Sequence, residues 1–305
     1  MIQSACLLIL VVAVTLRARR SYRKPAWWAT VFGLVSLATY GVIGAPPSVL
    51  DGFLGDRNLL TLVRDASGLA AMWAFHNAVA TERGFERRRL PWWSVAAAIA
   101  AFAIPFLLIT DPGHNSPRFV LDRLDQPAVW LFATLYTAFM GIVSALTIRM
   151  LAERRTAPTV FWVAGLSLMV VSDVLEVLYL CVAHFGPVSA SFREHYYYVS
   201  ELPFFSGIFL AVAGFIWILG ARTFWWAAAR WTVSVDARGR ERNYRENRLA
   251  LARAMGWSNR QLAFDSAANI RDRVKVGLQD LSAGERVAFA VVERTLSKKL
   301  KEVAA

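Results

Sequence analysis

The stretch LSLMVVSDVLEVLYLCV, residues 166–182, places two acids in a run that is otherwise apolar from Val160 onward. Asp173 and Glu176 lie three residues apart, so a helix carries both on one face. The run is long enough to cross a bilayer core, which takes about 20 residues. A charge inside a bilayer costs at least about 2.5–3.5 kcal/mol. Both acids are therefore expected to face the interior of a helix bundle or a water-filled cavity.

The composition of the whole chain fits the same environment. Of its 305 residues, 56% are hydrophobic and only 18% are charged, whereas about a quarter of a soluble domain is charged. We predict an all-α protein with a seven-helix transmembrane bundle over 1–221 and a small basic helical domain over 222–305. The predicted segments are about 2–16, 26–44, 59–81, 91–110, 127–148, 159–183 and 199–221.

Charge in the connecting loops predicts the orientation. The loops after the first, third and fifth segments carry twelve Lys or Arg, against four in the loops on the other side. The positive-inside rule then places the protein in the cell membrane, with its N-terminus outside and its C-terminus in the cytoplasm. The first apolar segment has no positive charge before it, unlike a signal peptide, so we read it as a retained helix. Tryptophans at the predicted cytoplasmic ends are candidate interface anchors: Trp27, Trp28, Trp92, Trp93, Trp225 and Trp226.

The third segment offers a partner for the intramembrane acids. Counted from the outer end at 1.5 Å per residue, Arg64 lies near the depth of Glu176, and Asp65 follows it directly. We expect Arg64 and Glu176 to pair, with Asp173 sharing their cavity. Two interpretations stay open: a structural ion pair that fixes helix packing, or a polar cavity that holds a ligand or relays protons. The ligand-binding or proton-relay candidates are Asp173, Glu176, Arg64, Asp65 and Glu201, the last near the outer end of the seventh segment.

Several classes of protein are disfavoured. The two cysteines, Cys6 and Cys181, imply no disulfide framework and no zinc site. No predicted segment contains a lysine, which excludes a retinal Schiff base. The chain shows no P-loop, nucleophile elbow or HExxH pattern. We therefore predict no enzyme activity, no catalytic residues, no cofactor and no metal.

Residues 222–305 differ in character from the segments before them. They hold seventeen Lys or Arg against nine Asp or Glu, which is +8 of the total charge of +12. Ser258-x-x-Gln261 and Ser282-x-x-Glu285 are capping-box patterns that each predict the start of a helix, and Gly256 predicts the end of an earlier one. Such a tail is expected to lie against anionic lipid at the cytoplasmic surface.

Part of this tail has the spacing of a helix-turn-helix. The stretch ARAMGWSNRQLAFDSA, residues 252–267, would supply its first two helices. Two departures disfavour DNA as a partner. Ala267 stands at the turn position where glycine is usual, and Arg273 stands where the second helix needs an apolar core residue.

The membrane part resembles a group of uncharacterised actinobacterial seven-helix integral membrane proteins that are loosely labelled transporters. VLDGFLGDRNLLTLVRDASGLAAMWAF, residues 49–75, carries the likeness, together with LYTAFMGIVSALTIRMLAERR, residues 135–155. The resemblance covers about residues 25–220 and implies the seven-helix fold. It assigns no site residue.

The function predicted first is a sensor or regulatory membrane protein, in which a polar site in the outer half of the bundle is coupled to the cytoplasmic tail. The alternative is a small proton- or cation-coupled transporter, and the third is a structural scaffold. The partners that fit these readings are the lipid bilayer, anionic lipid at the tail, a small-molecule or ion ligand, and a cytoplasmic protein.

The predicted topology can be tested with reporter fusions. A reporter joined after Ser116 should read as external, and one joined after Thr156 as cytoplasmic, because the loop charges place these two loops on opposite sides. The reverse pattern would overturn both the segment boundaries and the orientation.

Overall fold

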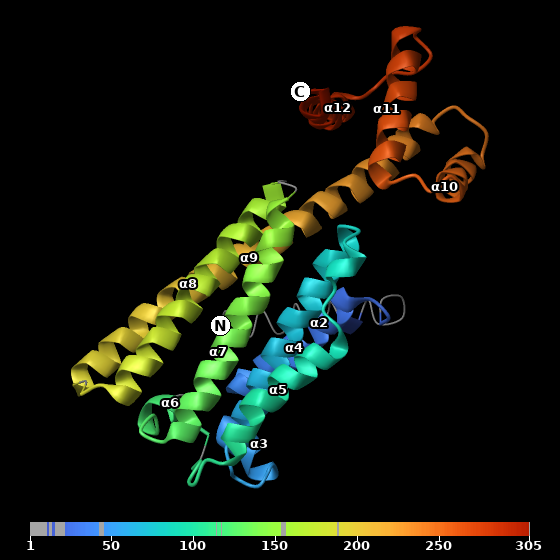
Figure 1. Cartoon of the computed structure of the whole chain (residues 1–305). Coiled ribbons are helices and arrows are strands. Elements are labelled where there is room, and N and C mark those ends of the chain that lie inside the picture. The colour runs from blue at the N-terminus through green and yellow to red at the C-terminus, as the bar shows by residue number, and fades with distance from the viewer. Residues whose placement is uncertain are drawn as a thin grey trace. The chain divides into compact units, whose positions relative to one another are not determined.

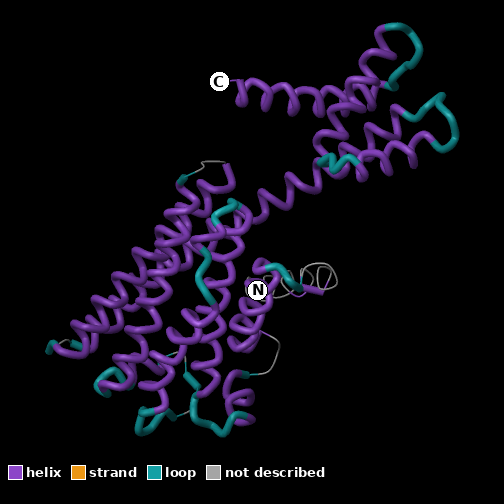
Figure 2. Tube along the Cα trace, turned by 45° about the vertical axis from the view of Figure 1, so that its right-hand side comes forward, coloured by secondary structure: helices purple, strands orange, loops and turns teal. Residues whose placement is uncertain are grey.

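The described chain is built entirely from helices (Figures 1 and 2). This computed structural model describes residues 11, 14–15, 22–42, 46–113, 115–116, 118–153, 157–187 and 189–304. It divides into two compact units, Met1–Gly214 and Phe215–Ala305. The all-α prediction is confirmed for these residues, while the predicted first segment lies almost wholly outside them.

The helices of the first unit follow one another with short connections. They are α2 (Pro25–Leu37), the π-helix η1 (Ala38–Val42), α3 (Pro47–Phe53), α4 (Leu59–Glu82), the 3-10 turn η2 (Glu86–Arg88), α5 (Trp92–Leu107), α6 (Phe119–Asp122), α7 (Pro127–Ala152) and α8 (Ala157–Phe185). The next helix, α9 (Ala190–Asp236), begins in the first unit and ends in the second.

Local sequence explains where several of these helices begin. Pro25, Pro47 and Pro127 start α2, α3 and α7, where the absent proline N–H would have had no helical partner. At the start of α4, the fully buried carboxylate of Asp51 accepts the backbone N–H groups of Asn58 at 2.8 Å and Leu60 at 3.0 Å. Asp51 thus satisfies donors that a helix start leaves unpaired.

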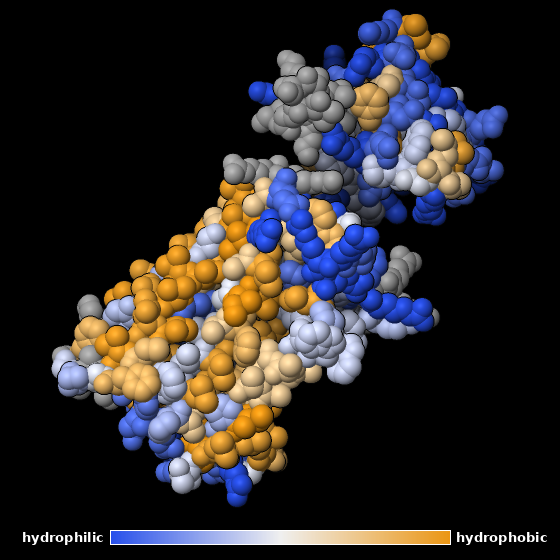
Figure 3. Space-filling model, in the orientation of Figure 1, coloured by the Kyte–Doolittle hydropathy of each residue, from blue (hydrophilic) through white to orange (hydrophobic). Residues whose placement is uncertain are grey.

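Four helices of the described chain are long and apolar enough to cross a membrane, which is compatible with an integral membrane protein. They are Glu86–Leu107, Pro127–Ala152, Thr159–Phe185 and Leu202–Asp236, and they match the last four predicted segments. The second predicted segment forms the 13 residues of α2 followed by the five of η1. The third forms α4, whose 24 residues have the length of a span but carry Arg64, Asp65, His76 and Asn77. Apolar side chains cover much of the face of the first unit in Figure 3.

Aromatic rings fill the core between α5, α6 and α7. Phe102, Phe106, Phe119 and Phe132 are each at most 3% exposed. Their ring centroids lie 5.0–6.1 Å apart, and most pairs meet edge to face, as aromatic rings prefer. This cluster fixes α7 in the middle of the unit, where it packs against both α4 and α8 (Figures 1 and 2).

Two glycines let α8 and α9 approach at backbone distance. A Cβ built on Gly207 would lie 2.5 Å from the carbonyl oxygen of Gly165, and one built on Gly165 would lie 2.6 Å from that of Gly207. Gly214 likewise leaves room for the ring of Trp162, whose indole N–H donates to Ala211 O at 3.1 Å. Small residues at helix crossings are how helices pack in membranes, where the hydrophobic effect does not drive helices together.

The second unit combines the end of α9 with α10 (Tyr244–Ala254), α11 (Asn259–Lys275) and α12 (Ala283–Ala304). Gly256 has φ +66° and Gly277 has φ +74°, so each ends a helix in the left-handed conformation that glycine favours. The predicted end at Gly256 is confirmed within two residues. The core consists of small and aliphatic side chains from all four helices: Ala228, Ala229, Val233, Ala252, Leu262, Ala263, Ala267 and Val292.

Both predicted capping boxes are confirmed. Ser258 and Gln261 exchange side-chain and backbone hydrogen bonds at the start of α11. Ser282 and Glu285 do the same before α12. The Arg238 guanidinium and the Ser282 backbone N–H hold the pKa of the Glu285 carboxyl at about 2, well below its usual range. Glu285 therefore stays ionised throughout the physiological pH range.

The close approach of α8 and α9 predicts a sharp response to one added methyl group. Gly207→Ala should destabilise the protein by about 1–3 kcal/mol, because the new Cβ meets a backbone carbonyl that cannot move aside. Gly33→Ala in α2 is the matched control: nothing lies within 4 Å of its added Cβ. The control should be neutral or slightly stabilising. Thermal unfolding in detergent measures both, and equal effects would refute the contact.

Candidate functional site

An ion pair on α4 forms one end of a polar chain inside the first unit. The Arg64 Nε donates to Asp65 Oδ1 at 3.0 Å, and Asp65 is only 7% exposed. The Arg64 guanidinium carbon also lies 5.1 Å from the ring centroid of Tyr40, which belongs to the π-helix η1. Single π-helical turns inside helices occur frequently at functional sites.

Tyr136 of α7 lies next along this chain. A Cβ built on Gly68, one turn beyond Arg64 on α4, would lie 3.3 Å from the Tyr136 hydroxyl, so the phenol depends on that glycine for room. The phenol interacts electrostatically with Arg64 and Asp65 on α4 and with Asp173 on α8. Tyr136 therefore links α7 to the charged groups of α4 through its contact with Gly68.

Asp173 and Glu176 of α8 form the other end. Asp173 is 7% exposed, and its side chain lies against Gly141 of α7, where an added Cβ would be 3.3 Å from Asp173 Cβ and 3.4 Å from Oδ2. The Asp173 Oδ2 is buried without a hydrogen-bond partner among the described residues. Glu176 is half-buried and interacts with Asp173 as a like charge. A buried carboxylate oxygen in this state is unusual, because more than about 90% of buried polar groups are satisfied.

The structure shows one partner of Arg64, its own neighbour Asp65 on α4. The expected pairing of Arg64 with Glu176 stays a prediction. In the fold, α7 packs against both α4 and α8 (Figure 1), with its Tyr136 against Gly68 of α4 and its Gly141 against Asp173 of α8. The side chain of Glu201 lies outside the described part of the chain.

Three residues of the polar chain were not predicted from the sequence: Tyr40, Tyr136 and Gly141. Each lies in an apolar segment where a tyrosine or a glycine is unremarkable. The one available signal was the position of Gly141, in the middle of a long helix, because glycine there weakens a helix and often marks a close approach. His76, which the sequence predicts to be a packed or hydrogen-bonded residue rather than a ligand, is buried, with its Nδ1 3.1 Å from Thr147 Oγ1 and its Nε2 3.0 Å from Arg88 O.

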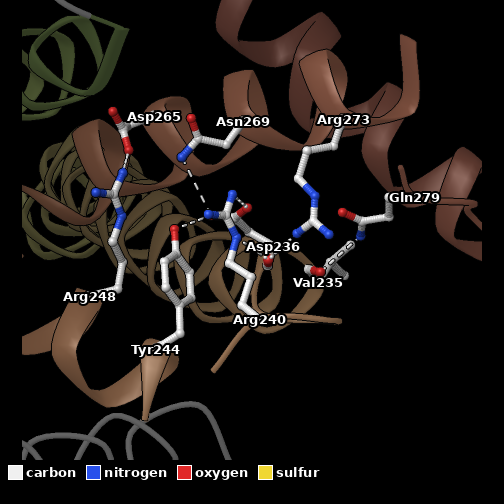
Figure 4. Close-up of polar contacts among 9 residues, drawn as sticks. All are labelled: Val235, Asp236, Arg240, Tyr244, Arg248, Asp265, Asn269, Arg273 and Gln279. Carbon is white, nitrogen blue, oxygen red and sulfur yellow. Dashed lines mark hydrogen bonds and ion pairs between the residues drawn. The ribbon is translucent and has the colours of Figure 1, made fainter. Parts of the chain in front are cut away.

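A second polar cluster joins the helices of the second unit around Asp236 (Figure 4). This carboxylate is fully buried at the last residue of α9. Its Oδ1 accepts Arg240 Nη2 at 2.9 Å, and its Oδ2 accepts the Tyr244 hydroxyl at 2.8 Å and Asn269 Nδ2 at 3.4 Å. Burial and the hydrogen bond to Asp236 raise the pKa of Tyr244, which therefore remains a donor.

Side chains also satisfy the backbone carbonyl groups at the end of α9. Arg273 Nη1 of α11 donates to Asp236 O at 3.0 Å, and Gln279 Nε2 donates to Val235 O at 2.9 Å. The last carbonyls of a helix lack helical partners, so these two side chains take that place. Arg248 of α10 and Asp265 of α11 add an ion pair beside them.

This cluster corrects the helix-turn-helix interpretation. α11 runs without interruption from Asn259 to Lys275, so Ala263 and Ala267 are buried inside one helix and no turn forms at Ala267. Arg273, which that motif would place in an apolar core, instead binds the end of α9. Its charge is satisfied by a backbone carbonyl.

The tryptophan anchors divide into exposed and packed residues. Trp92 is 72% exposed and Trp93 is 61% exposed, and Trp28 and Trp226 are also exposed. Trp27 is partly buried, with its indole N–H 3.3 Å from Val14 O. Trp225 packs against the core of the second unit. Anchoring at an interface stays a prediction for the exposed residues.

Comparison of the chain with models of protein families, with curated proteins and with solved structures finds no match.

The two possible partners of Arg64 can be separated by double-mutant cycles. Breaking a buried ion pair costs roughly 3–5 kcal/mol, and less here because the Arg64 side chain is 23% exposed. Arg64→Gln and Asp65→Asn should each destabilise the protein, and the double variant should recover part of the loss. The cycle of Arg64→Gln with Glu176→Gln is the matched comparison. A larger coupling with Glu176 than with Asp65 would show that the assigned pair is wrong.

Proposed function

We propose that this chain is a seven-helix integral membrane protein of the cell membrane, with its N-terminus outside, that senses a ligand, ion or proton and regulates through its C-terminal unit. Asp173 is the sensing residue. The observation that supports this choice is its buried Oδ2, which has no hydrogen-bond partner among the described residues, one helical turn from the half-buried Glu176. Ionisable groups inside membrane bundles usually mark ligand or proton sites.

The proposed signal is a change in charge at Asp173. Two neighbouring carboxylates repel each other, so binding of a cation or a proton relieves that repulsion and alters the packing of α8 against α7. The change in charge at Asp173 would act first on Tyr136, because its phenol interacts electrostatically with Asp173 and with the Arg64–Asp65 pair. A ligand changes the conformation only by as much as it prefers one state over the other.

Helix α9 provides a continuous route for the response. It contacts α8 at Gly207 and Gly214 through backbone-level packing, and its last residue is Asp236. A shift of α8 cannot be absorbed at the Gly165–Gly207 contact, because no flexible side chain separates the two backbones. In the second unit, the end of α9 is bound by Arg240, Tyr244 and Arg273, so rotation of this end changes contacts with α10 and α11.

The second unit would act at the membrane surface or on a cytoplasmic protein. Its excess of positive charge supports contact with anionic lipid, at about 1 kcal/mol for each basic residue near the surface. Trp226 is exposed, with the Arg230 guanidinium 4.5 Å from its ring centroid. An aromatic ring beside a cation suits the interface between headgroups and acyl chains.

One observation favours a second candidate, a small proton- or cation-coupled transporter. Asp65, Tyr136 and Asp173 lie on α4, α7 and α8, and α7 packs against both of the other helices. Such a sequence of ionisable groups across a bundle is the arrangement that proton relays use. In this reading the same residues carry the coupling ion, and the second unit has no part in the response.

The variant Asp173→Asn tests the proposal. It should leave stability unchanged or raise it by about 1–3 kcal/mol, because a neutral amide of the same shape replaces a buried carboxylate with an unpaired oxygen. It should also abolish the response of the purified full chain to ions or pH, measured as hydrogen-exchange protection of α10 and α11. Asp111→Asn, whose side chain is 81% exposed, is the control and should leave that response intact.

Ion uptake into proteoliposomes distinguishes the two candidates. Uptake that is lost in Asp173→Asn would establish the transporter. A change in protection of α10 and α11 without uptake would support the sensor. If Asp173→Asn changes stability alone, both proposals fail and the polar chain serves helix packing.

A further inference from the structure

An apolar groove lies between α4, α5 and α7, apart from the polar chain. Its volume is about 320 Å³, near the lower end of the roughly 300–1,000 Å³ of ligand sites. Leu69 and Trp73 of α4 form the floor. The walls come from the adjacent helices α5 and α7 and include Val95, Ala98, Ile142 and Leu146.

The groove opens on the outer surface of the helices rather than into the bundle. Ile142 is 54% exposed, and Trp93, at one end of the groove, is 61% exposed. α5 and α7 both belong to helices that can cross a membrane. On that outer surface the surroundings are acyl chains, so a slender apolar occupant fits the groove better than a soluble ligand.

One end of the groove carries positive charge. Arg149 follows Leu146 by three residues on α7, and therefore projects from the same face of the helix. Arg87 lies in the turn that leads into α5 at this end, beside Leu90 of the lining. Both guanidinium groups are exposed, and neither has a carboxylate partner among the described residues. An anionic group at this end would neutralise them.

The turn that carries Arg87 is held firmly to the floor of the groove. The Asn77 side chain of α4 donates to Leu90 O at 3.0 Å and accepts Leu90 N–H at 2.8 Å. His76 Nε2 lies 3.0 Å from Arg88 O. The positive end and the apolar groove thus keep a fixed spacing, which a ligand with a charged head and an apolar tail requires.

Trp73 sets the depth of the groove floor relative to the turn that carries Arg87. It lies four residues before Asn77 on α4, so it is one helical turn below the turn that carries the arginines. Its indole N–H is buried away from the groove, so the ring contributes an apolar surface to the floor.

We propose that this groove binds one acyl chain of an anionic phospholipid, with its phosphate between Arg87 and Arg149. The apolar lining alone would accept any acyl chain, and the two arginines select a negatively charged headgroup. By the predicted orientation the lipid belongs to the cytoplasmic leaflet, where anionic lipids attract basic residues. The site involves no residue of the polar chain, so it goes beyond the proposed sensor, and it rests only on the proposed membrane location and orientation.

Lipid binding to the delipidated full-length protein tests the proposal. Phosphatidylglycerol should bind more tightly than phosphatidylcholine with the same acyl chains, as measured by native mass spectrometry and thermal shift. Arg87→Gln combined with Arg149→Gln should weaken phosphatidylglycerol binding roughly 30-fold, from about 1 kcal/mol for each basic residue, and should remove the preference. The control is Arg57→Gln, an exposed arginine before the opposite end of α4, which should change nothing.

A second pair of variants tests the groove itself. Ala97→Phe places a ring in the groove and should weaken binding of both lipids, whereas Ala96→Phe, on a neighbouring exposed alanine outside the lining, should not. Both alanines are exposed, so a ring at either position should leave the fold intact. A difference in lipid binding between the two variants therefore reports on the groove. Equal binding of the two lipids, or no effect of Ala97→Phe, would overturn the proposal and leave only unspecific boundary lipid.

Discussion

The carboxylates inside an apolar helix bundle are the constraint on which the first unit depends. A buried acid must be paired, hydrogen-bonded or neutralised, since otherwise its desolvation would cost several kcal/mol. Asp51 meets this requirement with two backbone N–H groups, and Asp65 meets it with Arg64 on the same helix. Asp173 leaves one oxygen without a hydrogen bond within the described chain. Asp51 and Asp65 therefore stabilise the fold, whereas Asp173 is the carboxylate that we propose for sensing.

The same requirement has a different solution in the second unit. Asp236 is as deeply buried as Asp51, but its partners come from three separate parts of the chain: the connection after α9, α10 and α11. Burial of one charge therefore orients several helices at once, in a unit whose apolar core is built largely from alanines and a few larger side chains. Charged hydrogen bonds of this kind fix the orientation of the helices, which small core residues alone would define only loosely.

Sequence reasoning succeeded where the signal was local. The capping boxes and the long apolar runs of α7 and α8 depend on neighbouring residues, and the structure contains them where the pattern places them. It missed contacts that depend on which helices touch. The pairing of Arg64 with Asp65 was not predicted, and the expected pairing with Glu176 stays a prediction. Asp236 looked like an ordinary charge of a basic tail and Arg273 like a misfit in a helix-turn-helix core, and only the folded unit shows that they meet. The acids of α8 were recognised because their cost is visible in the sequence, whereas Tyr136 carried no such mark.

The facing glycines of α8 and α9 have a consequence for how this sequence can change over generations. At most contacts, a larger side chain on one helix can be compensated by a smaller one on the other. Gly165 and Gly207 allow no such exchange, because each obstructs the other with its backbone carbonyl, which every amino acid shares. Neither position can drift alone and neither can rescue the other. In a lineage that keeps this crossing, the surrounding apolar residues are free to diverge while the two glycines persist, and they would be the feature by which a distant homologue is recognised.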